Sequence, residues 1–170
     1  MKQFLMIGLT LIFGILNTSQ AQSIPSPSLE KYFESFSVGR MPFGMAKKMD
    51  WTRNSQGTQR ALPYKAYFEN AVSEFLKRGV GGMTTGKFLV IEIGCGTQCV
   101  AIGLYNLETG VPTLLEQVAT IGASCHPSSR LLVLDSQEAI LKVYSNEVPE
   151  WLQTQYLVIS DSGEAVSYIP

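Results

Sequence analysis

The strongest constraint on folding is the run Gly94 to Cys99, which reads Gly-Cys-Gly-Thr-Gln-Cys. It lies between two apolar, β-prone stretches, Lys87–Ile93 and Cys99–Tyr105, so the pattern predicts two strands joined by a tight turn. With residues 96–98 as a three-residue loop, Cys95 and Cys99 face each other across the neck of a hairpin. Their Cα atoms would then lie ~4.5–5.5 Å apart, within disulfide range. The two glycines allow the tight backbone that so small a ring requires.

The N-terminal residues have the layout of a secretion signal. Lys2 supplies the positive start, Phe4 to Leu16 form an apolar run, and the small residues Ser19 and Ala21 mark a cleavage point. The apolar run is shorter than the ~20 residues that a membrane span needs. We therefore expect cleavage after Ala21, a mature chain that begins at Gln22, no stable membrane anchor, and a periplasmic or secreted protein.

Export bears directly on the three cysteines. In an oxidising compartment, thiols that can meet usually form disulfides, and the hairpin favours a Cys95–Cys99 bridge. Cys125 then remains as a free buried thiol, because an unpaired cysteine packs like a small apolar residue. Pairing of Cys125 with either of the other two, or with another chain, remains an alternative.

Composition argues against several classes of partner. Removal of Lys2 with the signal leaves 12 basic and 14 acidic residues, and no block of like charge is present. This balance argues against nucleic acid or an anionic membrane as the partner. Charged residues make up 16% of the chain and hydrophobic ones 45%, which favours a folded domain over disorder.

The mature chain is long enough for a single domain. We divide the sequence into a signal peptide (1–21), an N-terminal lead with a polar loop (22–60) and a helix followed by strands (61–170), the last two forming one globular domain. The helix is expected over Leu62–Lys77, because aromatic and aliphatic residues recur there at three- and four-residue steps. The polar residues of Trp51–Gln59 are expected to form an exposed loop.

The rest of the chain reads as strands and turns. Beyond the first hairpin, a turn over Asn106–Gly110 leads into another strand, and the further strands are Arg130–Leu134, Ala139–Tyr144, Tyr156–Ile159 and Ala165–Ile169. Such close spacing leaves no room for crossover helices, so the sheet is expected to be antiparallel. We predict an α+β fold: a meander or sandwich-like sheet of about six to eight strands, with one amphipathic helix packed on it.

One combination of residues carries possible chemistry. Cys95 and Cys99, together with His126, the single histidine, offer thiolate and imidazole ligands that suit copper or a thiol-redox reaction. Two arguments oppose it. Neighbouring strand residues such as Cys125 and His126 point to opposite faces, and Met41, Met45 and Met49, at helical spacing, are more often core than ligands. We therefore assign no metal ligands and no catalytic residues, and we expect no cofactor.

The second half of the chain resembles an uncharacterised family of small exported bacterial proteins. The resemblance rests on the apolar strand with its Gly-Cys-Gly-Thr-x-Cys turn (Thr84–Cys99), the turn Asn106–Gly110, the element Ser129-Arg130-Leu131-Leu132 and the final hairpin (Tyr156–Ile169). It covers about half of the mature chain, from Gly82 onward. The resemblance implies export, a β-rich fold and pairing of Cys95 with Cys99, and it implies no activity or ligand.

These observations lead to a functional expectation. We expect an exported, non-catalytic domain that binds a protein or another envelope component, since binding loops are commonly carried on rigid scaffolds. The closed hairpin turn and the polar Trp51–Gln59 segment are the two candidate contact surfaces. The alternative is a periplasmic thiol-redox or copper-binding protein that uses Cys95, Cys99 and His126.

Overall fold

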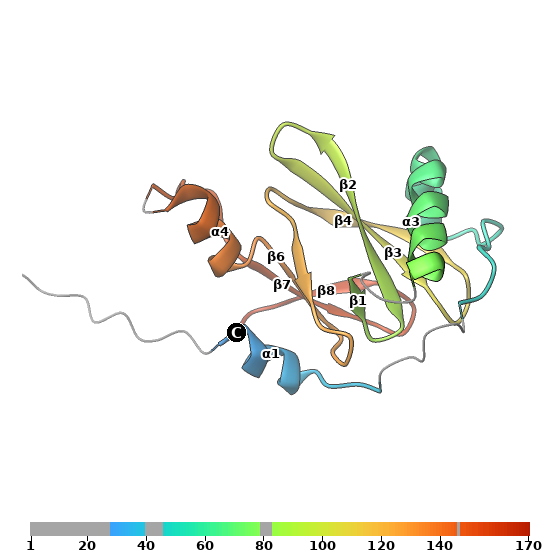
Figure 1. The fold of residues 1–170 in the computed structure, drawn as a ribbon, viewed down its shortest axis with the longest axis horizontal. Coiled ribbons are helices and arrows are strands. Elements are labelled where there is room, and N and C mark those ends of the chain that lie inside the picture. The colour runs from blue at the N-terminus through green and yellow to red at the C-terminus, as the bar shows by residue number, and fades with distance from the viewer. Residues whose placement is uncertain (1–27, 40–45, 79–82, 146) are drawn as a thin grey trace, which may run out of the picture.

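The chain folds into two stacked antiparallel sheets with helices on both outer sides (Figure 1). This computed structural model describes residues 28–39, 46–78, 83–145 and 147–170. Each sheet has four strands, in the orders β1-β2-β3-β4 and β5-β6-β7-β8. Among the described residues, no helix is long and apolar enough to cross a bilayer. The predicted α+β class and antiparallel pairing are thus confirmed.

The first sheet contains the predicted hairpin. Its strands are β1 (Thr84–Thr85), β2 (Phe88–Gly96), β3 (Cys99–Asn106) and β4 (Pro112–Ala119). β2 lies inside the sheet, between β1 and β3, and both of its faces are covered by other layers. A strand buried on both sides reads as a continuous apolar run, which is why its sequence pattern was so plain.

The second sheet corrects the prediction of one sheet with six to eight strands. Its strands are β5 (Ala123–Cys125), β6 (Leu131–Leu134), β7 (Gln155–Ile159) and β8 (Ala165–Tyr168). β5 pairs with β6 and not with β4, because the chain turns between them. The carboxylate of buried Asp135 accepts hydrogen bonds from the backbone N–H groups of Thr120, Ile121 and Gly122. These bonds hold the connection in place as the chain passes from one sheet to the other.

The predicted helix is confirmed in its main part. α3 (Lys65–Arg78) buries Phe68, Val72 and Phe75 against the first sheet. It is preceded by a 3₁₀ turn, η1 (Leu62–Tyr64), and by α2 (Gln56–Ala61), which begins inside the segment predicted to be a loop. Ser55 caps α2, since its hydroxyl accepts a hydrogen bond from the Thr58 N–H.

One predicted strand is wrong. Residues 139–144 belong to a helix, α4 (Gln137–Tyr144). The hydroxyl of Ser136 accepts a hydrogen bond from the Ala139 N–H, and Glu138 lies in the positive first turn, so the segment has a proper helix start. The apolar residues in it recur at helical steps as well as at strand steps. Length and capping, not hydrophobicity, separate the two structures.

Three apolar layers hold these elements together. The first lies between α3 and the first sheet, the second between the two sheets, and the third between the second sheet and α1 (Leu29–Ser35). In the third layer, Phe33 of α1 packs against Leu131 and Val133. Because side chains alternate between the two faces of β6, Leu132 and Leu134 point to the opposite face and pack in the layer between the sheets. The order is therefore helix, sheet, sheet, helix.

Candidate functional site

The cysteine hairpin is present, with a different turn from the one predicted. Cys95 and Cys99 form a disulfide with their Cα atoms 5.1 Å apart. Gly96 pairs with Cys99 and Gly94 pairs with Val100, so Cys95 is the extra residue of a β-bulge and does not face Cys99 directly. The loop between the paired residues is two residues long, and Gln98 within it has a positive φ of 55°.

The tip of this hairpin is exposed and points toward α4. Residues 94–98 are all exposed, and the side-chain amide of Gln98 donates a hydrogen bond to the Tyr144 hydroxyl at 3.3 Å. Tyr144 is the last residue of α4. The first sheet thus touches a helix that lies between β6 and β7 of the second sheet in the chain, at a point well outside the apolar layers.

Cys125 and His126 lie on opposite sides of the second sheet. Cys125 is the free cysteine of the described residues and packs against the layer between the sheets. Burial, with a smaller contribution from the nearby Glu92 carboxylate, raises the pKa of its thiol to about 12. The His126 ring stacks on Phe33 with 6.0 Å between centroids, and its Nδ1 accepts a hydrogen bond from the Ser128 N–H. A thiol that stays protonated at neutral pH is a poor nucleophile and a poor ligand.

The copper arrangement does not come together in the part of the chain that the structure describes. No three His, Cys, Asp or Glu side chains within those residues gather in a way that could hold a metal ion. Met49 packs beside the first apolar layer, whereas Met41 and Met45 fall outside the described residues.

The sheet edges offer a different kind of site. An edge strand presents unpaired N–H and C=O groups to any chain that comes beside it. The edge of β4 is covered by α2: Thr58 Oγ1 donates to the Pro112 carbonyl at 3.0 Å, and the Arg60 guanidinium donates to the Leu114 carbonyl at 3.2 and 3.3 Å. β1 has two residues, and β5 has three. β5 is also engaged, because the Ala123 N–H donates to Glu92.

β8 is the uncovered edge. Among the described residues, no strand or helix pairs with its outer side, and residues 165–170 have no charged side chain. The backbone groups that face outward follow from the ladder. The Ser160 N–H donates to the Glu164 carbonyl, on the β8 side, whereas the Ile159 N–H donates to the Arg130 carbonyl, on the β6 side. Hydrogen-bonded pairs alternate in an antiparallel ladder, so we infer that the N–H and C=O groups of Ala165 and Ser167 point away from β7.

Beside this edge runs an apolar row, which we call the outer row. It consists of Tyr156, Val158, Val166 and Tyr168 on the face of the second sheet away from the first. α1 and the residue after it cover this row only in part, through ring contacts of Tyr32 with Tyr156 and of Phe36 with Tyr168. Val166 is 61% exposed, and Ile169, just beyond the strand, is 89% exposed. The open edge and the open apolar face are thus continuous.

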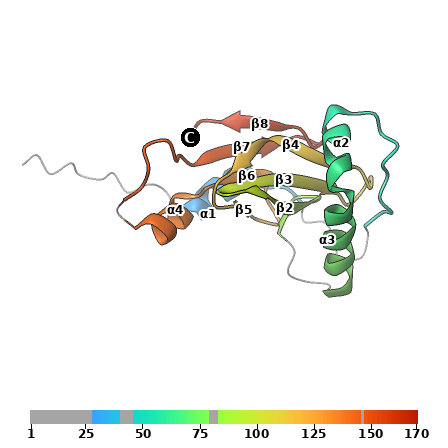
Figure 2. The ribbon, with the colours of Figure 1, turned by 90° about the horizontal axis from the view of Figure 1, so that it is seen from above.

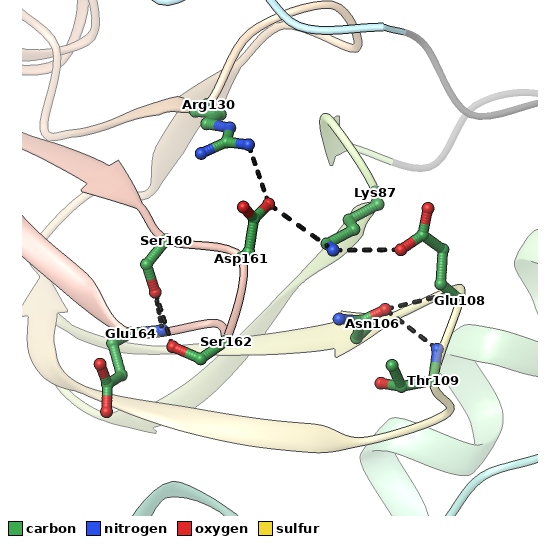
Figure 3. Close-up of polar contacts among 9 residues, drawn as sticks. All are labelled: Lys87, Asn106, Glu108, Thr109, Arg130, Ser160, Asp161, Ser162 and Glu164. Atoms are coloured by element: carbon green, nitrogen blue, oxygen red, sulfur yellow. Dashed lines mark hydrogen bonds and ion pairs between the residues drawn. The ribbon is translucent and has the colours of Figure 1, made fainter.

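The turn that precedes β8 is firmly held (Figure 3). The Asp161 carboxylate forms an ion pair with Arg130 at 2.8 Å and a longer one with Lys87 at 3.6 Å. Lys87 also pairs with Glu108 of the neighbouring turn at 3.0 Å. Gly163 has a φ of +89°, which suits the left-handed position of a three-residue hairpin. Each exposed pair contributes little by itself, but together they tie the turn to both sheets.

A groove of about 550 Å³ opens beside the start of β8. Its walls are the segment around α2, the inner face of β4 and the β7–β8 turn. It contains five charged residues: Arg53, Arg60, Glu116, Asp161 and Glu164. Arg60 pairs with Glu116 at 2.9 Å, and Asp161 is paired as described above. Within the described residues, Arg53 and Glu164 make no ion pair.

Comparison with known proteins gives no parallel for this arrangement. No protein-family model, no curated protein and no solved structure matches the chain. The geometry of the chain itself therefore carries the functional argument.

The sequence draws attention to some of the residues that line this groove. The polar Trp51–Gln59 segment was predicted as a contact surface, and four of its residues, including Arg53 and Gly57, line the groove. The open edge at β8 was missed. The signal available was the absence of charge and of internal proline from residues 165–169, because natural edge strands are usually protected by such residues.

Proposed function

We propose that this chain is an exported, non-catalytic domain that binds another protein by adding one of the partner's strands to β8. The observation that supports the proposal most strongly is the contrast between β8 and the other sheet edges. α2 covers the edge of β4, and the remaining two edges belong to strands of two and three residues. β8 alone, among the described strands, combines an open edge with an exposed apolar face.

Strand addition is a recognised mode of peptide binding. Backbone hydrogen bonds supply affinity, and alternate side chains supply specificity. The outward N–H and C=O groups of Ala165 and Ser167 would provide the backbone hydrogen bonds. The outer row would contact the alternate side chains of the partner strand and so provide specificity. The ion pairs of Asp161 reduce the ordering cost of binding, because they hold the hairpin before the partner arrives.

Export and family membership belong to the same proposal. We propose that residues 1–21 direct the chain to the periplasm or the exterior, and that the chain is one of the small exported proteins with the Gly-Cys-Gly-Thr-x-Cys turn. The copper or thiol-redox alternative has less support. Its candidate ligand His126 stacks on Phe33 at the α1 side of the second sheet, and the nearby Cys125 thiol has a raised pKa.

A proline substitution tests strand addition. Ser167→Pro removes an outward N–H without removing a bond to β7, whereas Ser167→Ala keeps the N–H and serves as the matched control. A capped peptide of alternating valine and threonine is titrated against each protein by isothermal calorimetry. We expect the peptide to bind the wild type and the alanine variant and to slow hydrogen exchange at the Ser167 amide. Equal binding to the proline variant, or no binding to the wild type, would contradict the proposal.

A further inference from the structure

We infer that the segment bound at β8 alternates apolar residues with charged residues of both signs, and that its charged side chains enter the groove. This inference rests on the proposed function, because it describes the strand that β8 would receive. It names the chemistry of the partner: an extended, amphipathic protein segment that carries both acidic and basic residues on one face.

The two faces of an added strand would meet two different surfaces. Successive residues of a strand point to opposite sides of the sheet. On the outer side, they would lie beside Val166 and Tyr168, which are 61% and 36% exposed. On the inner side, they would lie beside Ala165, which packs toward the layer between the sheets and also lines the groove. Apolar residues of the partner strand therefore suit the outer side, and polar residues suit the inner side.

The position of β8 brings the groove within reach. Figure 2 shows β8 at the margin of the stacked sheets, with α2 near the end of the β7–β8 hairpin. The groove is lined by Glu164 and Ala165 at the beginning of β8, by Thr113, Leu115 and Gln117 of β4, and by residues 55–57 at the start of α2. A strand that continues the second sheet would thus run along the mouth of the groove.

The charges of the groove specify what the inner side chains should be. Arg60 and Glu116 neutralise each other, and Asp161 is engaged by Lys87 and Arg130. The charges left without an ion pair in the described chain are Arg53, which precedes α2, and Glu164, which precedes β8. Arg53 also lies near Asp50, whose pKa is lowered first by hydrogen bonds from Thr52 and also by the Arg53 charge. They come from different walls and have opposite signs. An acidic side chain directed to Arg53 and a basic one directed to Glu164 would complement both.

The test uses three capped peptides against the whole mature protein. In the first, valines alternate with lysine and glutamate. In the second, threonine replaces every charged residue. The third has the composition of the first, with the valines grouped in one block. We expect the first to bind about fivefold more tightly than the second at low salt, an advantage that falls at high salt, and the third to bind most weakly.

Two charge variants locate the effect. Glu164→Gln and Arg53→Gln are each expected to remove most of the advantage of the charged peptide while leaving binding of the threonine peptide unchanged. Glu147→Gln and Lys142→Gln, which change exposed charges outside the groove, are the matched controls and should have no effect. The inference is overturned if the first and second peptides bind equally, or if the controls act like the groove variants.

The failure of this inference can be told apart from the failure of the proposed function. If both alternating peptides bind equally and Ser167→Pro abolishes both, strand addition stands and the charge preference is wrong. If neither peptide binds the wild type, or if the proline variant binds both, strand addition and the charge preference fail together.

Discussion

The ring of Phe68 lies directly on the backbone of Gly103: a Cβ atom placed on this glycine would lie 2.6 Å from the ring's Cζ atom. Phe68 is fully buried between α3 and the first sheet, so it has no room to move aside. The absence of a side chain at position 103 is therefore what lets α3 approach β3.

The first prediction follows from this contact. Gly103→Ala is expected to lower the free energy of unfolding by about 1–3 kcal/mol, the usual cost of overpacking a core. Urea denaturation followed by tryptophan fluorescence measures the change. Gly94→Ala is the control, because nothing lies within 4 Å of a Cβ placed there. An unchanged unfolding midpoint for Gly103→Ala would show that the helix can shift away from the sheet.

The second prediction concerns the passage between the sheets. Asp135 is 2% exposed and accepts three backbone N–H bonds. Asp135→Ala would leave those donors without their acceptor, and we expect a loss of at least about 2 kcal/mol of stability. Asp135→Asn keeps one acceptor oxygen and tolerates the positive φ of 50°, so it should lose less. Equal losses in the two variants would mean that the shape of the side chain, and not its oxygens, stabilises the turn.

The third prediction concerns alkaline pH. The pKa of Cys125 is raised from 9.0 to about 12, so the native state favours the protonated thiol. The contribution of this group to stability is complete below pH 9 and is lost as the pH rises from 9 toward 12. Burial also raises the pKa of Tyr105, and the same window therefore includes more than one group.

A difference measurement isolates the cysteine. Stability is followed by chemical denaturation between pH 8 and 11 for the wild type and for Cys125→Ala. The wild type should lose more stability over this range than the variant. In the native wild type at neutral pH, Cys125 should also react slowly with a thiol reagent and react fully once urea is added. Parallel pH curves together with fast native labelling would contradict the raised pKa.

The fourth prediction is a thiol count. Protein that is denatured without reductant should show one reactive thiol, and reduction should show three, because Cys95 and Cys99 are joined. The ring is small, so replacing both cysteines by serine should cost only about 2 kcal/mol in the chain-entropy treatment. Three thiols in unreduced material would show that no disulfide is present, and a thiol on Cys95 with Cys125 blocked would show a different pairing.

Much of the first sheet could be predicted because its signals are local. The strands β2 and β3 are continuous apolar runs, and Gly110 has the positive φ that its turn requires. In the same way, the helical spacing of Phe68, Val72 and Phe75 was sufficient to place α3.

The contacts that divide the strands into two sheets join residues that are distant in the sequence. Nothing in the composition of β5 says that it pairs with β6 and not with β4, because the deciding contact joins Asp135 to backbone groups of residues 120–122. Strand order also decides which edge stays open. For that reason, the open edge at β8, where we propose binding, can be identified only from the assembled fold, although the polar residues before and within α2 indicate part of the neighbouring groove.

The covering of β4 by α2 has a consequence for assembly. A protein with two open edges can join its copies end to end without limit, as in a fibril. Here the described strands leave one extended edge free. If β8 receives a partner strand as proposed, its complexes should stop at one partner strand per chain, or at a closed pair of two chains, because no second extended edge is open among the described strands.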